Sequence, residues 1–426
     1  MTPHPPEAGQ RPGERWILFA PALLSLAPFI AFHGLFARLF WFGDDIDQVD
    51  LIDRHGLWRW MWMFYGENLV PLFKLLWGSC VFLFGGSYDA MIGIIWLNHA
   101  LNVLLLGRLM RTCGFKWTPV LLTQTVFGLA PSIIENLAFS VEWSVVLSVT
   151  FMLLALQEVF RPAFRWVTVL WALASALSFV KGVLTGPALA FASLLQRGGA
   201  PRRGARLAHA CAYLLPSIVV GTLIAVLAEG NHRHLSGHGS EAAVFGVWYY
   251  CLNPVYYLLD VQSWGWRTVV VLGLLKVSLV IWAFLRSRGN VRNLFLVLVA
   301  FDLATAVLLG IGRYNFGIRT AASSRYQYVS LIGIVPLAAF GFAHLWERLR
   351  LPAWVRQGSL ASLFAATILA LMVRWHSEMV SWSGWRGTDV RRILLEEAEP
   401  GPDSVPGYPG FPTKRAKELI AKYHLH

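Results

Sequence analysis

Charged residues are scarce in this chain of 426 residues. Asp, Glu, Lys and Arg make up 14% of it, whereas 56% of its residues are hydrophobic; soluble domains carry about 25% charged residues. The deficit is concentrated in stretches such as 16–33 and 268–285, which are nearly free of charge. Because roughly 17–25 apolar residues span a bilayer as a helix, the composition excludes a soluble enzyme and a disordered chain. It predicts an all-α polytopic membrane protein.

Cysteine and acidic residues are also few. The four cysteines show no CxxC spacing, which excludes a disulfide-stapled secreted module, and we expect them to be small packing residues. Asp and Glu number 24 against 36 Lys and Arg, but the basic excess lies in short loops between hydrophobic segments, as in cytoplasmic loops of membrane proteins. No basic face with interleaved aromatic residues exists outside the membrane, so nucleic acid is excluded as a partner.

The basic loops set the order of the predicted spans. We expect a cytoplasmic tail over 1–15, a transmembrane domain over 16–374 that begins with a retained first span, and a short outer tail over 375–426. The hydrophobic lengths predict eleven spans: 16–39, 88–107, 117–132, 142–160, 166–180, 183–196, 207–228, 267–285, 293–311, 326–346 and 357–374.

The face opposite the basic loops is predicted to carry the functional site. It receives the outer loop 40–87, for which we expect interfacial helices including one over 69–84, and the polar loop 229–266. The short spans around 166–196 are interrupted at Lys181-Gly182, which predicts two helices that meet below this surface. Broken helices at membrane depth occur where the backbone faces protein or a water-filled cavity.

Three carboxylates are expected at this face. Asp44 and Asp45 directly follow the first span, where they could act as a general base, bind a divalent cation or favour a helix N-terminus. Glu135 reaches the same face from the end of the third span. No motif requires a cofactor or a metal site, and Mg²⁺ or Mn²⁺ at the Asp pair is left open.

Cations accumulate at the same level, against the usual charge bias of outer loops. Lys181, Arg313, Arg319 and Arg325 make up this set, and it predicts anion binding. Arg325 is the strongest candidate because a planar guanidinium can bind an anion through two nitrogens. The alternative is a side chain that snorkels at a span end.

Polar side chains inside a span are functional candidates by default. His99 and Asn102 lie one turn apart on one face of the second span; hydrogen bonding between helices is the alternative. The loop 231–238 contains H-x-H-x3-H at His232, His234 and His238. No fourth ligand is evident, so a polar loop is favoured over a zinc site.

In their order along the chain, these motifs resemble the C-type (GT-C) membrane glycosyltransferases, above all the polyprenyl- or dolichyl-phosphate-mannose-dependent group with transmembrane and TPR parts. The resemblance covers 44–333, about two thirds of the chain. The family motifs and the segments that match them are the Asp pair at 44–45, R-P-L at 70–72, H-x-x-N-x-x-x-H at 99–106, F-x-x-H-P-x-x-x-E at 127–135, S-K-E at 180–182 and E-R-Y-x-Y-x-P-S-x-G at 324–333. Several of these segments depart from their motif: 70–72 lacks the Arg, Leu106 replaces the second His, Ala130 replaces the His before proline, and Gly182 replaces the Glu. The tail 375–426 is too short for three TPR repeats of about 34 residues.

The resemblance implies an inverting enzyme that moves a sugar from polyprenyl phosphate to a glycan, lipid or protein acceptor. A base, Asp44 or Asp45 with Glu135 in reserve, would take the acceptor proton. The donor phosphate would be bound by Arg325, Lys181, Arg319 and Tyr326, and the substrate would be contacted by His99, Glu67 and Tyr328. We expect an integral protein among membrane lipids, in a bacterial inner membrane with its site facing the periplasm; an endoplasmic-reticulum membrane is the alternative.

Two other functions remain open at this stage. A flippase or transporter of a lipid-linked saccharide would use the same cations for phosphate and would need polar groups at the membrane midplane and on both faces. A non-catalytic partner in glycan assembly is favoured by the family residues missing at Ala130 and Gly182.

Overall fold

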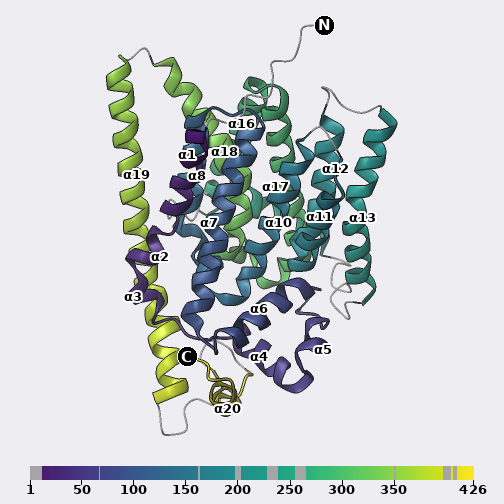
Figure 1. The fold of residues 1–426 in the computed structure, drawn as a ribbon, viewed down its shortest axis with the longest axis vertical. Coiled ribbons are helices and arrows are strands. Elements are labelled where there is room, and N and C mark those ends of the chain that lie inside the picture. The colour runs from purple at the N-terminus through teal and green to yellow at the C-terminus, as the bar shows by residue number, and fades with distance from the viewer. Residues whose placement is uncertain are drawn as a thin grey trace.

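The computed structural model describes residues 12–66, 68–161, 164–196, 203–227, 238–254, 265–349, 352–396, 404–405 and 410–426. Within these ranges every regular element is a helix, and the extended pairings are two isolated bridges, Tyr65–Asn68 and Ser404–Pro412. Most helices run side by side as a bundle, and α4, α5, α6 and α20 lie together at one end, which we call the α4 end (Figure 1). Most of the expected tail 1–15 lies outside the described residues.

The first half of the chain contains α1 (Pro12–Leu24), α2 (Ala27–Ala31), α3 (His33–Phe36), α4 (Asp44–His55), α5 (Leu57–Met61), α6 (Pro71–Leu83), α7 (Tyr88–Thr112), α8 (Trp117–Leu129), η1 (Pro131–Ile133), α9 (Ile134–Ala138), η2 (Ser140–Glu142), α10 (Trp143–Val159), α11 (Trp166–Ser178), η3 (Val180–Leu184) and α12 (Thr185–Leu195). The second half contains α13 (Arg203–Leu227), α14 (Gly239–Leu252), α16 (Gly265–Arg286), α17 (Gly289–Arg313), η6 (Tyr314–Phe316), η7 (Ile318–Ala322), η8 (Ser324–Tyr326), α18 (Gln327–Arg348), α19 (Ala353–Trp382), η9 (Ser383–Asp389), η10 (Arg392–Glu396) and α20 (Thr413–Tyr423).

Seven helices of the described part are long and apolar enough to cross a membrane, and an eighth is formed if α8 and 131–138, bent by 47°, make one span. The chain is therefore an all-α polytopic membrane protein. The number of helices of this length is therefore smaller than the eleven spans expected from the sequence. Three of them fall on shorter apolar helices, Trp16–Ala31, Trp166–Ser178 and Val180–Leu195, because Pro28 restarts the first and the Lys181-Gly182 break separates the other two.

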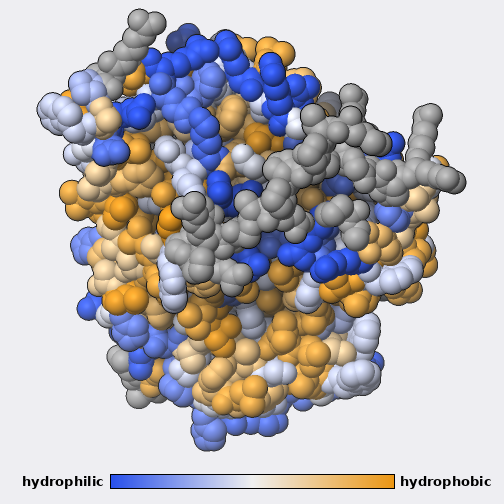
Figure 2. All heavy atoms as spheres, turned by 45° about the horizontal axis from the view of Figure 1, so that its top comes forward, coloured by the Kyte–Doolittle hydropathy of each residue, from blue (hydrophilic) through white to orange (hydrophobic). Residues whose placement is uncertain are grey.

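The flanks of the bundle are apolar surface. Only 6% of the most apolar stretch of Ala353–Leu395 is buried and 33% of that of Trp266–Arg286, against 83% for Ser140–Val159. Hydrophobic residues cover the flank, while hydrophilic residues gather over the end opposite α4 (Figure 2). Lipid tails are as apolar as leucine, so a membrane covers what the protein leaves exposed.

Hydrogen bonds fasten α7 to α10 in the interior. Asn98 Nδ2 donates to Thr150 Oγ1 at 2.8 Å, and Gln157 Nε2 donates to the Leu105 carbonyl at 3.1 Å. Since apolar burial does not favour one helix neighbour over lipid, such bonds and close packing specify the pairing.

The break expected at Lys181-Gly182 is present as η3, between α11 and α12. A Cβ atom on Gly182 would lie 1.9 Å from the Ser175 carbonyl oxygen and 2.7 Å from Ser148 Oγ. Only glycine fits at this contact, which gives a physical reason why no glutamate stands there.

The loop expected over 229–266 contains a helix instead. α14 packs on α17 so closely that a Cβ on Gly310 would lie 2.3 Å from the Ala242 carbonyl oxygen. The sequence did not indicate this helix, because the apolar run 242–252 is too short to span a membrane.

The C-terminal helix α20 is bound to α4 by ion pairs and a hydrogen bond. Arg415 binds Asp50 at 2.7 Å and Asp53 at 2.6 Å, and Tyr423 Oη donates to Asp53 at 2.7 Å. Lys422 and these partners hold the pKa of Asp53 below its ordinary value. Helix α20 therefore lies at the same end as α4, α5 and α6 (Figure 1).

The packing at η3 can be tested with a pair of glycine variants. Gly182→Ala inserts a methyl group into backbone and is expected to cost about 1–3 kcal/mol or more, seen as loss of the monodisperse peak in size-exclusion chromatography. Gly358→Ala, on α19 with nothing within 4 Å of its Cβ position, is the matched control and keeps the wild-type profile. A monodisperse Gly182→Ala protein with the wild-type Tm would contradict the described contact.

Candidate functional site

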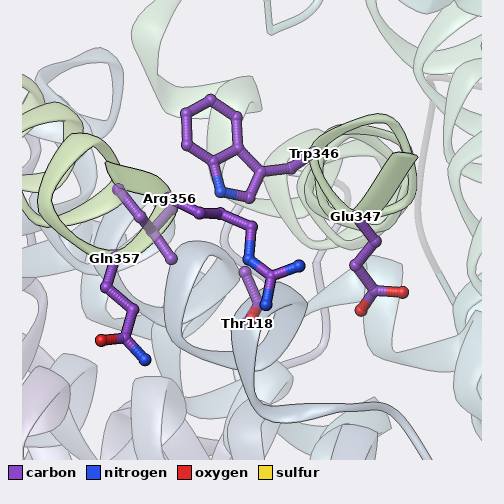
Figure 3. A pocket seen from close by; sticks show the side chains of 6 residues that line it. Thr118, Trp346, Glu347, Arg356 and Gln357 are labelled. Atoms are coloured by element: carbon purple, nitrogen blue, oxygen red, sulfur yellow. The ribbon is translucent and has the colours of Figure 1, made fainter. Parts of the chain in front are cut away.

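A surface pocket of about 470 Å³ lies at the end opposite α4, lined by Thr118, Trp346, Glu347, Arg356, Gln357 and Leu360 (Figure 3). Its carboxylate, Glu347, is already paired with Lys116 at 2.7 Å. α18 has 22 residues, so at 1.5 Å per residue about 33 Å separates its two ends. None of the residues predicted for the site lines this pocket.

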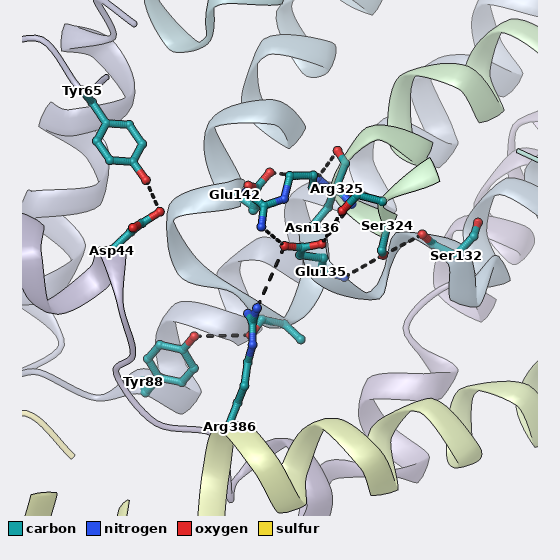
Figure 4. A network of polar contacts seen from close by, with 12 residues as sticks. Asp44, Tyr65, Tyr88, Ser132, Glu135, Asn136, Glu142, Ser324, Arg325 and Arg386 are labelled. Carbon is teal, nitrogen blue, oxygen red and sulfur yellow. Dashed lines mark hydrogen bonds and ion pairs between the residues drawn. The ribbon is translucent and has the colours of Figure 1, made fainter. Parts of the chain in front are cut away.

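The α4 end holds a cluster of carboxylates and arginines (Figure 4). We call it the carboxylate–arginine cluster: Asp44, Asp45, Glu135, Glu142, Arg325 and Arg386. Its members come from α4, α9, η2, η8 and η9, so segments far apart in the sequence converge here. The structure thus brings together the three predicted carboxylates and the strongest predicted cation.

The centre of the cluster is an ion pair between Arg325 and Glu135. Arg325 Nη2 lies 2.6 Å from Glu135 Oε1. The second oxygen, Oε2, accepts from the Arg325 backbone N–H at 3.2 Å and from Ser323 Oγ at 3.3 Å. Glu135 is 5% exposed, whereas the Arg325 side chain is 40% exposed. A ligand therefore reaches the arginine more readily than its carboxylate partner.

Local backbone chemistry places Glu135 here. Proline 131 cannot continue the hydrogen bonds of α8 and forces Ala130 into extended backbone, with ψ 115°. The chain therefore turns into η1 and α9. Ser324 Oγ accepts from the Glu135 backbone N–H at 3.2 Å and donates to the Ser132 carbonyl at 2.8 Å, which locks α9 to the start of α18.

Asp44 opens α4 after Gly43, whose φ of +52° a residue with a side chain rarely adopts. It is partly exposed and accepts a hydrogen bond from Tyr65 Oη at 2.5 Å. Its charge at the first turn also complements the helix dipole. Asp44 is therefore both held in place and open to a ligand.

Asp45 is enclosed, unlike its neighbour. It is 0% exposed; Oδ1 accepts from Ser140 Oγ at 2.5 Å, and Oδ2 has no hydrogen-bond partner among the described residues. Burial, with a smaller contribution from the Asp44 charge, raises the pKa of Asp45 from 3.8 to about 7. In this geometry Asp45 cannot touch a substrate hydroxyl, so the two members of the pair have different surroundings.

Lys181 and Tyr326 lie together near the cluster. Lys181 is 3% exposed, its Nζ has no hydrogen-bond partner in the described chain, and it lies 4.9 Å from the centroid of the Tyr326 ring. Glu142 interacts electrostatically with Arg325, Lys181 and Asp44. Arg319 lies exposed on η7.

His99 and Tyr328 are fully buried between helices. His99 Nε2 lies 3.2 Å from the Gly128 carbonyl, to which it donates, so Nδ1 accepts from Tyr328 Oη at 2.9 Å. Tyr328 Oη in turn accepts from Asn102 Nδ2 at 3.0 Å. These are the contacts of the alternative interpretation, hydrogen bonding between helices.

Several sequence predictions fall on residues that the structure does not describe. Glu67, His232 and His234 lie outside the described residues. His238 forms an exposed pair with Glu241 at 3.0 Å. Among the described residues no three His, Cys, Asp or Glu side chains are grouped so as to hold a metal ion.

Sequence reasoning missed Arg386 and a second polar network. Arg386 closely follows Trp382 and Trp385 in the tail, and a cation beside tryptophans was an available signal. Lys276 and Asp302 pair at 2.7 Å between α16 and α17, and Lys276 Nζ also donates to the Tyr250 and Asn253 carbonyls at 2.8 and 3.1 Å. Both charges lie inside predicted spans, where ionisable residues mark candidates.

No protein-family model matches this chain, and no curated protein matches it. The resemblance to the C-type glycosyltransferases therefore stays a prediction.

The enclosure of Asp45 predicts a pH-dependent stability difference. Its folded-state pKa is raised, so in wild type the burial cost grows as pH rises from about 4 to 7 and is full above pH 7. Asp45→Asn stays neutral and is expected to raise Tm by about 2–4 °C at pH 8, with almost no change at pH 4, in differential scanning fluorimetry. Asp389→Asn, at an exposed site, is the control. An equal shift at both pH values would contradict the enclosure.

Proposed function

We propose that this chain is a membrane glycosyltransferase that moves a sugar from a polyprenyl-phosphate donor to a glycan, lipid or protein acceptor at the α4 end. The observation that carries the proposal is that one cluster holds both a partly exposed carboxylate, Asp44, and a partly exposed guanidinium, Arg325. The order of the family-like motifs from 44 to 333 supports it.

In the proposed reaction, Asp44 accepts the proton of the acceptor hydroxyl. The hydroxyl oxygen attacks the anomeric carbon from the face opposite the phosphate. The anomeric C–O bond breaks, its electron pair leaves with polyprenyl phosphate, and the configuration inverts. Tyr65 orients Asp44, so the base is positioned before the substrate arrives.

Arg325 is proposed to bind the phosphate of the donor, where negative charge grows as the bond breaks. Its guanidinium can bind two phosphate oxygens at once. Lys181 contributes a second positive charge nearby, and Tyr326 holds that lysine in place. Asp45 is proposed to fix the start of α4 through Ser140, and Glu135 to serve as the counter-ion of Arg325, a role that differs from the reserve base.

The proposed topology has eleven spans. They are the seven long helices, the bent pair α8 and 131–138, and the three shorter apolar helices Trp16–Ala31, Trp166–Ser178 and Val180–Leu195. Basic loops on one side support a cytoplasmic N-terminus. The cluster then faces the periplasm of a bacterial inner membrane.

A flippase for a lipid-linked saccharide is the second candidate function. The buried Lys276–Asp302 pair favours it, because charges inside spans are typical of transport pathways. Consumption of the donor by purified protein separates the two proposals, since a flippase leaves the donor intact.

The base assignment is tested with isosteric variants. Asp44→Asn removes basicity and is expected to lower turnover about 10²–10⁴-fold with donor binding unchanged. Asp45→Asn is the matched control and keeps most of its activity. The assay follows release of polyprenyl phosphate from polyprenyl-phosphate hexoses in detergent. Near-normal turnover of Asp44→Asn would mean that the base lies elsewhere.

The phosphate assignment is tested at Arg325. Arg325→Lys keeps the charge and loses the planar fork, so donor affinity is expected to fall about tenfold, roughly 1.4 kcal/mol. Arg356→Lys, in the pocket at the end opposite α4, is the control and keeps wild-type affinity in the same binding titration. Unchanged affinity in both Arg325→Lys and Arg325→Ala would defeat the assignment.

A further inference from the structure

Glu135 stands between two arginines, and it is bonded to one of them. Its Oε1 atom lies 2.6 Å from Arg325 Nη2 and 4.0 Å from Arg386 Nη2 (Figure 4). The first distance is a charge-assisted hydrogen bond; the second is about 1 Å too long for one. A small movement of the carboxylate would exchange its partner.

Arg386 is built into the protein as an unsatisfied donor. It is 9% exposed, and its guanidinium carbon lies 4.0–5.2 Å from the ring centroids of Phe42, Phe139, Trp382 and Trp385. Nε and Nη1 are buried and have no hydrogen-bond partner among the described residues. Buried guanidinium groups ordinarily find acceptors, and Glu135 is the carboxylate within 4.0 Å of this one.

The position of Arg386 is fixed by its neighbour in sequence. A Cβ on Gly387 would lie 2.4 Å from the Arg38 carbonyl oxygen, so η9 lies directly against the segment that leads to α4. The aromatic rings on the other side restrict the guanidinium. Arg386 therefore cannot move far toward Glu135, and the flexible partner is the glutamate side chain.

The side chains of the two arginines differ in exposure and therefore in access to an anion. The two guanidinium groups share the one carboxylate of Glu135, and Glu142 also acts electrostatically on Arg325. The Arg325 side chain is 40% exposed and that of Arg386 is 11% exposed. An anion therefore meets Arg325, whose fork already holds Glu135. To bind Arg325 through two nitrogens, the anion must displace Glu135 Oε1.

We propose that Arg386 is a positioning residue that receives Glu135 when a phosphate binds Arg325. This inference rests on the proposed function, in which that phosphate belongs to a polyprenyl-phosphate donor. Glu135 acts as a resting occupant of Arg325; once it turns to Arg386, its charge stays neutralised and no longer repels the phosphate. The C-terminal segment beyond α19 thereby becomes part of the donor site.

The test measures binding of polyprenyl phosphate, without a sugar, to the full chain in detergent. Arg386→Gln is expected to weaken binding about tenfold, because the displaced carboxylate then has no counter-ion. Glu135→Gln removes the occupant and is expected to strengthen binding. In the Glu135→Gln background, Arg386→Gln changes affinity less than about threefold. Arg374→Gln, an arginine of α19 paired with Glu378, is the matched control and leaves affinity unchanged.

Equal weakening by Arg386→Gln in both backgrounds, or none in either, would overturn the inference. Failure of wild type to bind polyprenyl phosphate would overturn it as well. If Arg386→Gln does not fold, Arg386→Lys serves in its place. It keeps the charge and loses the planar fork, so its affinity is expected to fall below that of wild type only when Glu135 is present. Glutamate-dependent binding without sugar transfer would support the arginine exchange and contradict the glycosyltransferase proposal, so the two failures are distinguishable.

Discussion

The Arg325–Glu135 ion pair is the contact on which the organisation of the α4 end depends. It joins residues 190 positions apart and fixes the start of α18 against the turn that follows α8. Removing Arg325 would leave the buried Glu135 carboxylate uncompensated, which costs more than the pair contributes. The bonds from Ser324 Oγ to the Ser132 carbonyl and from the Glu135 N–H to Ser324 Oγ fix the backbone here, so α9 and η8 form a frame to which α4 and the tail add their side chains.

Around this frame the chain separates enclosed charges from accessible ones. Asp45 and Lys181 are enclosed, whereas Asp44 and Arg325 keep a route to ligand. The separation follows from packing, because α6 carries Trp77 under Ser140 and thereby closes Asp45, with Trp77 Nε1 donating to Ser140 Oγ at 2.8 Å. Two adjacent aspartates thus differ in surroundings and in reach, and only the partly exposed one is suited to touch a substrate.

The all-α polytopic architecture was predictable because the thickness of the bilayer fixes how many apolar residues a spanning helix needs. The structure confirms this architecture. The count of eleven spans stays a prediction, since prolines and the Lys181-Gly182 break shorten three helices below spanning length. The helix α14 escaped prediction because an apolar run of its length fits neither a span nor a polar loop.

The candidate site was predictable only in part. Asp44 could be proposed because it closely follows the first predicted span, and Arg325 because it directly precedes the span predicted over 326–346. Which aspartate is enclosed could not, because burial is decided by Trp77 and Ser140, far away in sequence. Arg386 was missed since it lies beyond the motifs, and its partner Glu135 is about 250 residues earlier in the chain. Contacts over such separations are set by tertiary packing, which local patterns do not encode.

The most direct test of the central claim is a cryo-EM structure of the protein in lipid nanodiscs with polyprenyl phosphate bound. The account predicts phosphate density within hydrogen-bonding distance of the Arg325 guanidinium, on the side of Asp44, with the Glu135 carboxylate turned toward Arg386. Phosphate density in the pocket beside Arg356, with Glu135 still bonded to Arg325, would contradict it.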